Sequence, residues 1–287
     1  MINRCNRCMA DKGDAIICPN CGYINNSATV NPDYLPPTTR LHQRYELGNL
    51  LSYNNESGVY IAYDTQIDTV VEIREFMPRP IAVRNPDDGS LLVEKDPLPL
   101  YKQLSTEFID LNHALSKIRT IGDLVQVYEL FTENNTFYIV MEHVEGESLN
   151  EYLSQKYGEL NLEEALNLFS STVKSLQKLH EIGLVHGGIS PQTLYINRNN
   201  QVKIGGFCIP SIRRENPLIE PELFEGYAAP EQYDTDGNSF GPWTDVYAMA
   251  AVLYKSLIGS KPSSSHSRLS VDNLVAPNML NSSIPTN

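Results

Sequence analysis

Four of the five cysteines form two C-x2-C pairs near the start of the chain: Cys5, Cys8, Cys18 and Cys21. Two-residue spacing lets both thiolates of a pair reach one ion from a tight turn. Two such turns close a tetrahedral site, which is typical of structural zinc. Gly22 follows the second pair, where the turn favours a residue that tolerates positive φ. A segment this short cannot bury a core, so we expect metal binding to supply its folding free energy.

This stretch resembles a short zinc ribbon, and we predict one over residues 1–24. Two alternatives stay open at this point: disulfides or free thiols in place of a metal site, and iron in a rubredoxin-like site. No basic segment followed by an apolar one opens the chain. We therefore expect a cytoplasmic protein, in which disulfides are rare. Cys208 stands apart from the others and is expected to be a small buried residue.

The composition excludes several classes of protein. The chain has 287 residues, and 41% of them are hydrophobic, which is enough for a packed core. No apolar run approaches the roughly 18 residues that a membrane span requires. The formal net charge of −13 would repel a phosphate backbone, so nucleic acid is not an expected partner. The acidity is also explained by solubility alone.

The main domain opens with strand-like patterns. Residues 25–40 are polar and contain prolines, so they are predicted to be a linker. Residues 41–145 contain the β-rich runs "GVYIAYDT", "TVVEIREFM" and "NNTFYIVMEHV". The last run is entered through Asn134 and Asn135, which are typical of a hairpin turn. Between the strands, "STEFIDLNHALSKIR" has apolar residues at helical spacing: Phe108, Leu111, Leu115 and Ile118.

Residues 146–260 have helical patterns. Ser148 with Glu151, and Asn161 with Glu164, predict capping boxes at the start of two helices. The second helix has apolar residues expected on one face: Leu162, Leu166, Phe169, Val173 and Leu176. The run "TDVYAMAAVLYKSLIG" is apolar all round and predicts a buried helix.

A strand-rich part with one helix, followed by a helical part, predicts an α+β fold of two lobes. Residues 261–287 are rich in Ser, Asn and Pro and are predicted to be loop or tail.

Several motifs carry a resemblance to a known family. "YIVMEHVEGESLNEYL" is similar to the last N-lobe strand, the hinge and the first C-lobe helix of a protein kinase. "GYAAPEQY" matches the APE motif through Ala229, Pro230 and Glu231, and "DVYAMA" matches the start of the buried F helix through Asp245. "HGGISPQTLYIN" and "VKIGGFC" match HRD-type and DFG-type loops. From about Tyr45 onward the chain therefore resembles a eukaryotic-type Ser/Thr protein kinase of the bacterial kind.

The resemblance implies a kinase-like fold with a β-rich N-lobe and a helical C-lobe, after a zinc ribbon as in some bacterial kinases. The last C-lobe helices have no counterpart before residue 287, so an incomplete C-lobe is expected. The arginine that usually pairs with Glu231 belongs to that part. His186 and Asp245 are expected to brace the catalytic loop, and so to be structural.

The catalytic positions of the family are changed. Gly188 stands at the catalytic aspartate and Gly187 at the preceding arginine. Thr193 replaces the metal-binding asparagine. Gly206 replaces the aspartate of DFG, and Cys208 its glycine. Ser190 is a milder change, because some bacterial kinases have serine there. Phosphoryl transfer needs metal ions and a carboxylate that orients the hydroxyl, and glycine supplies neither.

The N-lobe positions are changed as well. Arg74 falls at the third-strand lysine, and Leu111 at its glutamate partner, with Glu107 one turn away as a substitute. The three glycines of the phosphate-covering loop fall at Ser52, Asn54 and Ser57.

The nucleotide pocket is predicted to be filled. Glu72 falls where the family's alanine covers the adenine, and Tyr195 where a small aliphatic residue lies beneath it. Glu72 and Arg74 are two apart on a strand, so they face the same way, and we predict that they pair. The alternative is a solvated strand with two ordinary charges. We expect ATP to bind weakly or not at all.

The sequence thus favours a pseudokinase that acts as a binding scaffold or allosteric regulator in bacterial signalling. The expected partner is a protein, such as an active kinase or another signalling protein. Zinc is the expected structural cofactor. One alternative is a residual Ser/Thr kinase that uses Glu72, Arg74 or Asp64. Another is an interaction protein in which the ribbon alone makes the contacts.

Overall fold

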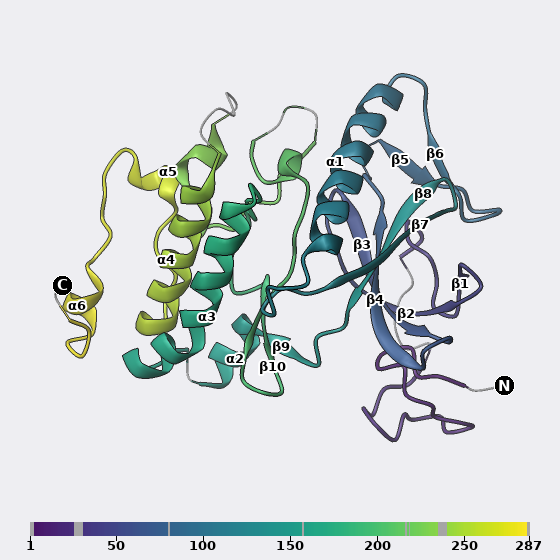
Figure 1. Cartoon of the computed structure of the whole chain (residues 1–287), viewed down its shortest axis with the longest axis horizontal. Helices are drawn as coiled ribbons and strands as arrows, with labels where there is room; N and C mark the ends of the chain where they lie inside the picture. The colour runs from purple at the N-terminus through teal and green to yellow at the C-terminus, as the bar shows by residue number, and fades with distance from the viewer. Residues whose placement is uncertain are drawn as a thin grey trace. The chain divides into compact units, whose positions relative to one another are not determined.

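The computed structural model describes all residues except 1, 2, 26–30, 80, 157, 216, 218, 235–239, 286 and 287. It has two compact units (Figure 1). Unit 1 comprises residues 1–118 and 126–143, and unit 2 comprises residues 119–125 and 144–287. The domain boundaries expected from the sequence stay predictions. None of the helices in the described residues is both long and apolar enough to cross a bilayer.

Unit 1 is built on a six-stranded antiparallel sheet. Its strands are, in spatial order, β1 (Arg40–Leu41), β2 (Tyr45–Tyr53), β3 (Ser57–Asp64), β4 (Thr69–Phe76), β8 (Thr136–Glu142) and β7 (Val127–Glu133). A separate hairpin joins β5 (Ala82–Arg84) and β6 (Leu91–Val93). The helix α1 (Leu98–Lys117) packs on β7 and β8 (Figure 1). The β-rich runs and the helix were thus located correctly from their periodicity.

Aromatic residues fill the space between α1 and the sheet. Phe76 on β4 lies 4.9 Å from Phe108 and 5.5 Å from Tyr101, measured between ring centroids. Asn134 and Asn135 both have positive φ, at 50° and 56°, which is the conformation that a tight hairpin turn requires. The predicted hairpin therefore joins β7 to β8.

A buried carboxylate ties unit 1 together. Glu75 is fully buried and accepts hydrogen bonds of 2.7 Å from the hydroxyls of Tyr60 and Tyr138. Arg84 pairs with the same carboxylate at 2.6 Å. A buried charge is tolerated only with such partners.

Residues 31–40, the described part of the predicted linker, include two buried side chains. Tyr34 and Leu35 are buried, and the Leu35 amide donates to the Tyr60 hydroxyl at 3.0 Å. Tyr34 and Leu35 therefore pack against the rest of unit 1, so the stretch is not solvated along its whole length. Residues 26–30 of the linker lie outside the described residues.

Unit 2 contains a small sheet and a group of helices. The sheet has the order β11–β10–β9, with β9 (Gly146–Ser148), β10 (Leu194–Asn197) and β11 (Val202–Ile204). The helices are α2 (Leu149–Gln155), α3 (Leu162–Glu181), α4 (Pro242–Ile258), α5 (Ser265–Arg268) and α6 (Pro277–Leu280), with single 3₁₀ turns at Pro210–Ile212 and Pro230–Tyr233. Both predicted capping boxes are present, at the first residues of α2 and α3. The predicted tail therefore contains two single-turn helices, α5 and α6.

The predicted apolar face of α3 was only partly correct. Leu166 is 57% exposed and Val173 is 48% exposed. The buried face is instead formed by Ala165, Leu168, Phe169, Thr172, Ser175, Leu176 and Leu179. Small side chains lie on this face because α3 packs against α4, and apolar periodicity alone does not register them.

The prediction that α4 is buried all round was wrong. Trp243 is 58% exposed and Val246 is 62% exposed. The opposite face, with Ala248, Met249 and Val252, is buried. Hydrophobicity on every side of a helix predicts contacts on every side, but the described residues of this chain cover only part of α4.

Candidate functional site

The HRD-like loop of unit 2 is held by Asp245, which is fully buried at the start of α4. Its carboxylate accepts hydrogen bonds from the backbone amides of His186, at 2.9 Å, and Gly187, at 2.7 Å. The Nε2 atom of His180, on α3, lies 2.8 Å from the same carboxylate. Three contacts satisfy a charge that would otherwise be costly to bury. This arrangement fixes the path of the loop.

His186 connects the HRD-like loop to the DFG-like loop. Its Nδ1 accepts from the Gly188 amide at 3.1 Å, so its Nε2 carries the proton and donates to the Gly205 carbonyl at 2.7 Å. Burial lowers the pKa of His186 to about 4, which keeps the imidazole neutral at physiological pH. The ring therefore acts as a fixed connector.

Arg213 lies against Gly188, and Gly188 is the residue that the sequence resemblance places at the family's catalytic aspartate. A Cβ atom at Gly188 would lie 2.5 Å from Arg213 Cζ. The guanidinium is 1% exposed, donates to the Gly206 carbonyl at 2.5 Å and pairs with Glu222 at 2.7 Å. A side chain at position 188 would therefore compete with Arg213 for space. Sequence reasoning missed Arg213, because no motif marks it.

Thr193 and Gly206 are fitted to each other. The Thr193 hydroxyl donates to the Gly188 carbonyl at 2.8 Å and accepts from the Ser190 amide at 2.9 Å. A Cβ atom at Gly206 would lie 2.6 Å from the Thr193 methyl carbon. The two changed positions, Thr193 and Gly206, therefore compensate each other sterically.

Gln232 and Glu231 connect the segment after the DFG-like loop to the HRD-like loop, to Arg213 and to the start of α4 by hydrogen bonds. The Gln232 amide donates to the carbonyls of Gly187, at 2.7 Å, and Arg213, at 2.6 Å. Glu231, for which the family resemblance implied an arginine partner, accepts from the Thr244 hydroxyl at 2.6 Å.

Arg74 of unit 1 does not pair with Glu72, so that prediction was wrong. Arg74 pairs with Glu56 at 2.5 Å, and its Nε donates to the Ser57 hydroxyl at 2.8 Å. Glu72 instead lies 2.9 Å from His143 Nδ1. The physical reason is burial. Glu56 is fully buried and needs a charged partner, whereas Glu72 keeps 21% of its side chain exposed.

Glu56 lies in the turn where the sequence resemblance places the phosphate-covering loop. The Asn54 side chain accepts from the amides of Glu56, at 3.0 Å, and Ser57, at 2.9 Å. The backbone closes the turn from Asn54 N to Ser57 O at 2.9 Å. Ser52 lies on β2 and pairs with Val59. The turn is therefore folded onto Arg74 instead of being an open glycine loop.

The remaining predicted positions are described each within its own unit. Leu111 and Glu107 lie on α1, where Leu111 is half-buried and Glu107 accepts from Gln103 at 3.2 Å. Tyr195 lies on β10 of unit 2, and its ring contacts Gly205, where a Cβ atom would lie 2.9 Å away. The joint filling of a nucleotide pocket by Glu72 and Tyr195 stays a prediction.

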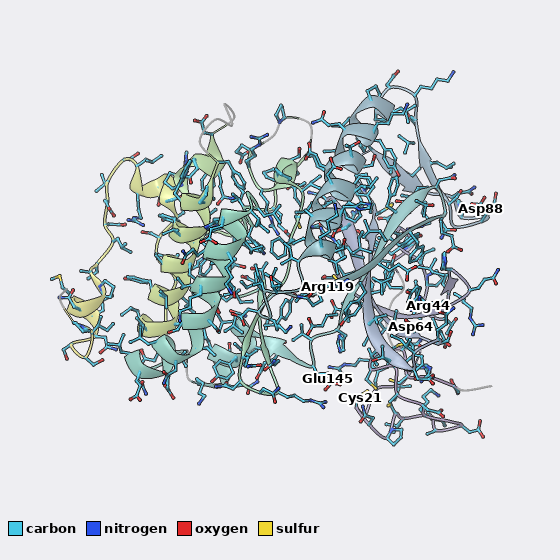
Figure 2. The ribbon with its side chains drawn as sticks, in the orientation of Figure 1. Cys21, Arg44, Asp64, Asp88, Arg119 and Glu145 are labelled. Carbon is cyan, nitrogen blue, oxygen red and sulfur yellow. The ribbon has the colours of Figure 1, made fainter. Side chains whose placement is uncertain are left out.

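Asp64, proposed for a residual enzyme, is engaged by Arg44 in unit 1. Arg44 binds its carboxylate in bidentate fashion, at 2.8 Å and 2.6 Å, and the two side chains lie side by side in Figure 2. Burial would raise the pKa of Asp64, but the hydrogen bonds from Arg44 and the Gln66 amide outweigh it and lower the pKa. Asp64 is therefore a paired carboxylate and a poor proton acceptor.

The cysteines form two matching turns in unit 1. In the first, the Met9 amide donates to the Cys5 carbonyl, and in the second the Gly22 amide donates to the Cys18 carbonyl, both at 2.8 Å. Gly22 has the expected positive φ of 72°.

The four sulfur atoms are close enough for one metal ion. They lie within 4.8 Å of one another, with separations of 3.6 Å for Cys5–Cys21 and 3.7 Å for Cys8–Cys18. A tetrahedral ion with metal–sulfur bonds of about 2.3 Å requires sulfur–sulfur distances of about 3.8 Å, whereas a disulfide bond is about 2.05 Å long. The four cysteines therefore could bind a metal such as zinc.

The comparisons with known proteins agree with this geometry. The protein kinase domain family matches residues 100–284, which is more than half of the chain. The chain belongs to the protein kinase family. The kinase-like fold predicted from the sequence is thus confirmed. The structure titled "PpkA-294 apo form" supports the same fold, with a TM-score of 0.71 and 24% identity over 88% of this chain and 92% of that one.

Bacterial Ser/Thr kinases are among the relatives of this kinase-like chain. Serine/threonine-protein kinase PknA of Mycobacterium tuberculosis (strain ATCC 25177 / H37Ra) is 36% identical over 142 residues, which are 48% of this chain and 32% of PknA. Serine/threonine-protein kinase PrkC of Bacillus subtilis (strain 168) is 26% identical over 235 residues, which are 81% of this chain and 33% of PrkC. The chain therefore spans about a third of the length of these two relatives.

Proposed function

We propose that this member of the kinase family transfers no phosphate and acts as a protein-binding scaffold or allosteric regulator in bacterial signalling. The observation that carries the proposal is Arg213. Its guanidinium lies where a side chain at Gly188 would be, and Gly206 likewise has no room for one. A catalytic carboxylate and a metal-binding carboxylate are therefore both missing, and a cation occupies the space between the two loops.

The pairing of Arg74 in unit 1 supports the proposal that nucleotide binding is weak or absent. Arg74 stands at the position of the lysine that contacts phosphates in the family, and Glu56 neutralises it within a buried pair. Phosphate binding to Arg74 would have to break that pair and leave Glu56 buried without its charge partner. ATP is therefore expected to bind weakly or not at all.

Nucleotide binding is tested by thermal unfolding of the purified chain with millimolar ATP, with and without magnesium. We expect a shift in Tm of less than about 1 °C, because a ligand stabilises only in proportion to its occupancy. A magnesium-dependent increase of several degrees would contradict the proposal and favour a residual kinase.

We further propose that Cys5, Cys8, Cys18 and Cys21 hold one structural zinc ion. Burial raises the pKa of the Cys21 thiol to about 12, so metal binding must displace its proton, and affinity should rise with pH. Elemental analysis of protein purified without chelator should find about one zinc per chain. Iron in its place, or no metal, would overturn the assignment.

The proposed partner is a protein, such as an active kinase or another signalling protein. Affinity capture with the purified chain as bait should retain the same protein with and without ATP. A second bait with Cys18→Ser separates binding by the kinase-like body from binding by the ribbon. Loss of capture with this second bait alone would favour a ribbon-led interaction protein, and no specific capture by either bait would contradict the scaffold proposal.

A further inference from the structure

The cysteine segment is packed directly on the sheet of unit 1. The Asn49 amide on β2 donates to the Asn6 carbonyl at 2.6 Å, so a residue between Cys5 and Cys8 extends the hydrogen bonding of β2. Gly48 permits this approach. A Cβ atom there would lie 2.5 Å from the Asn6 carbonyl oxygen and 2.6 Å from Met9 Sδ. Figure 1 shows the purple N-terminal segment next to β2.

Met9 has the conformation of a glycine and the burial of a core residue. It occupies the same place after Cys8 that Gly22 occupies after Cys21, and its φ is +58°. A non-glycine residue in this region is strained by roughly 1 kcal/mol or more. Met9 is nevertheless only 1% exposed, because its side chain lies against Gly48. Its presence is therefore explained by packing between the cysteine segment and β2, since the turn itself would favour glycine.

One contact with β3 fixes the same interface, and two hydrogen bonds within the segment hold its ends together. The Arg4 guanidinium carbon lies 3.2 Å from the centroid of the Tyr63 ring on β3. The Asn25 side chain accepts from the Asn6 amide at 3.0 Å and donates to the Arg4 carbonyl at 3.0 Å. The segment therefore contacts both β2 and β3, and both of its ends are tied to each other.

We propose that the metal-loaded cysteine segment is a clamp on the β2–β3 hairpin, so that metal occupancy controls the order of that hairpin. The proposal rests on the zinc site proposed above. Without the ion, residues 3–25 lose their source of folding free energy and cannot hold Asn6 and Met9 in place. The hairpin ends at the turn that carries Glu56, so loss of metal also loosens the support of the Glu56–Arg74 pair.

The test is hydrogen–deuterium exchange of the full chain, read in peptides that cover residues 45–64. Three samples are compared with the zinc-loaded chain: chelated chain, Cys18→Ser, and Met9→Gly. Met9→Gly is the most specific of the three samples. Glycine suits the turn and the four thiols are kept, while the side chain that contacts Gly48 is removed. Asn200→Gly is its matched control, since Asn200 has a similar φ of 56° on the exposed surface of unit 2.

We expect exchange in residues 45–64 to become about tenfold faster in all three samples, while Met9→Gly keeps its zinc and Asn200→Gly behaves like the parent chain. Unchanged exchange in the chelated chain, or in Met9→Gly with zinc bound, would overturn the clamp and leave the zinc site intact. Absence of zinc from the parent chain would overturn both the zinc site and metal control. Faster exchange in Met9→Gly would then demonstrate only metal-independent packing.

Discussion

Arg74 and Arg213 are both buried, and each guanidinium is paired with a glutamate from a nearby turn or loop. In each case the cation lies at or beside a position to which the sequence resemblance assigns a catalytic group of the kinase family. A buried ion pair adds little net stability, but loss of one partner is costly because the other charge stays buried. These arginines are therefore expected to be sensitive to changes in their partners.

The two glutamates near Arg74 provide a matched comparison. Glu56→Gln removes the buried carboxylate that pairs with Arg74 and should lower the free energy of unfolding by about 3 kcal/mol. Glu72→Gln affects a pair with His143 in which both side chains keep part of their surface exposed, and it should cost less than about 1 kcal/mol. Urea unfolding of both variants measures the difference. Equal effects would mean that Glu56 is not the partner of Arg74.

His186 should make stability depend on pH. Its folded pKa of about 4 lies below its ordinary value of 6.5, so the unfolded chain binds the proton more tightly. This contribution is fully present above pH 6.5 and is lost as the pH falls toward 4. When the pH falls from 7.5 to 5.5, the free energy of unfolding should decrease by about 1 kcal/mol more in the parent chain than in His186→Gln. Urea unfolding of both proteins at both pH values measures this difference. Parallel pH profiles would contradict a buried neutral imidazole.

Among the elements, α2 and α3 show which features can be predicted from local sequence patterns and which depend on packing between helices. The capping boxes at Ser148 and Asn161 were predictable, because they depend on residues three apart. The buried face of α3 was not, because close packing against α4 places Ala165 and Thr172 inside and leaves Leu166 exposed. A hydrophobicity pattern ranks such residues in the opposite order.

A pair of leucines on α3 tests the corrected face. Leu176→Ala removes a side chain that is 4% exposed and should cost about 2–5 kcal/mol of unfolding free energy. Leu166→Ala, at 57% exposed, should change it by less than about 0.5 kcal/mol. Thermal or urea unfolding decides between this face and the one predicted from periodicity, for which both changes would cost the same.

For the molecule as a whole, the sequence predicted the kinase-like fold and the grouping of the four cysteines, because both depend on local motifs in a fixed order. It did not predict contacts between distant segments. The pairing of Glu56 with Arg74, the position of Arg213 beside Gly188, and the packing of Met9 on Gly48 join residues whose chain separation carries no pattern. The first two of these contacts support the proposal that the chain transfers no phosphate, and the third supports the proposed clamp.

The central claim is that this kinase-like chain transfers no phosphate. The most direct measurement is the transfer of radiolabelled phosphate from ATP, with magnesium or manganese, to the chain itself and to generic protein substrates. A parallel preparation of Arg74→Met controls for a contaminating kinase, whose activity the variant would not change. We predict no incorporation above a buffer control in either preparation. Incorporation by the parent chain that Arg74→Met abolishes would contradict the claim.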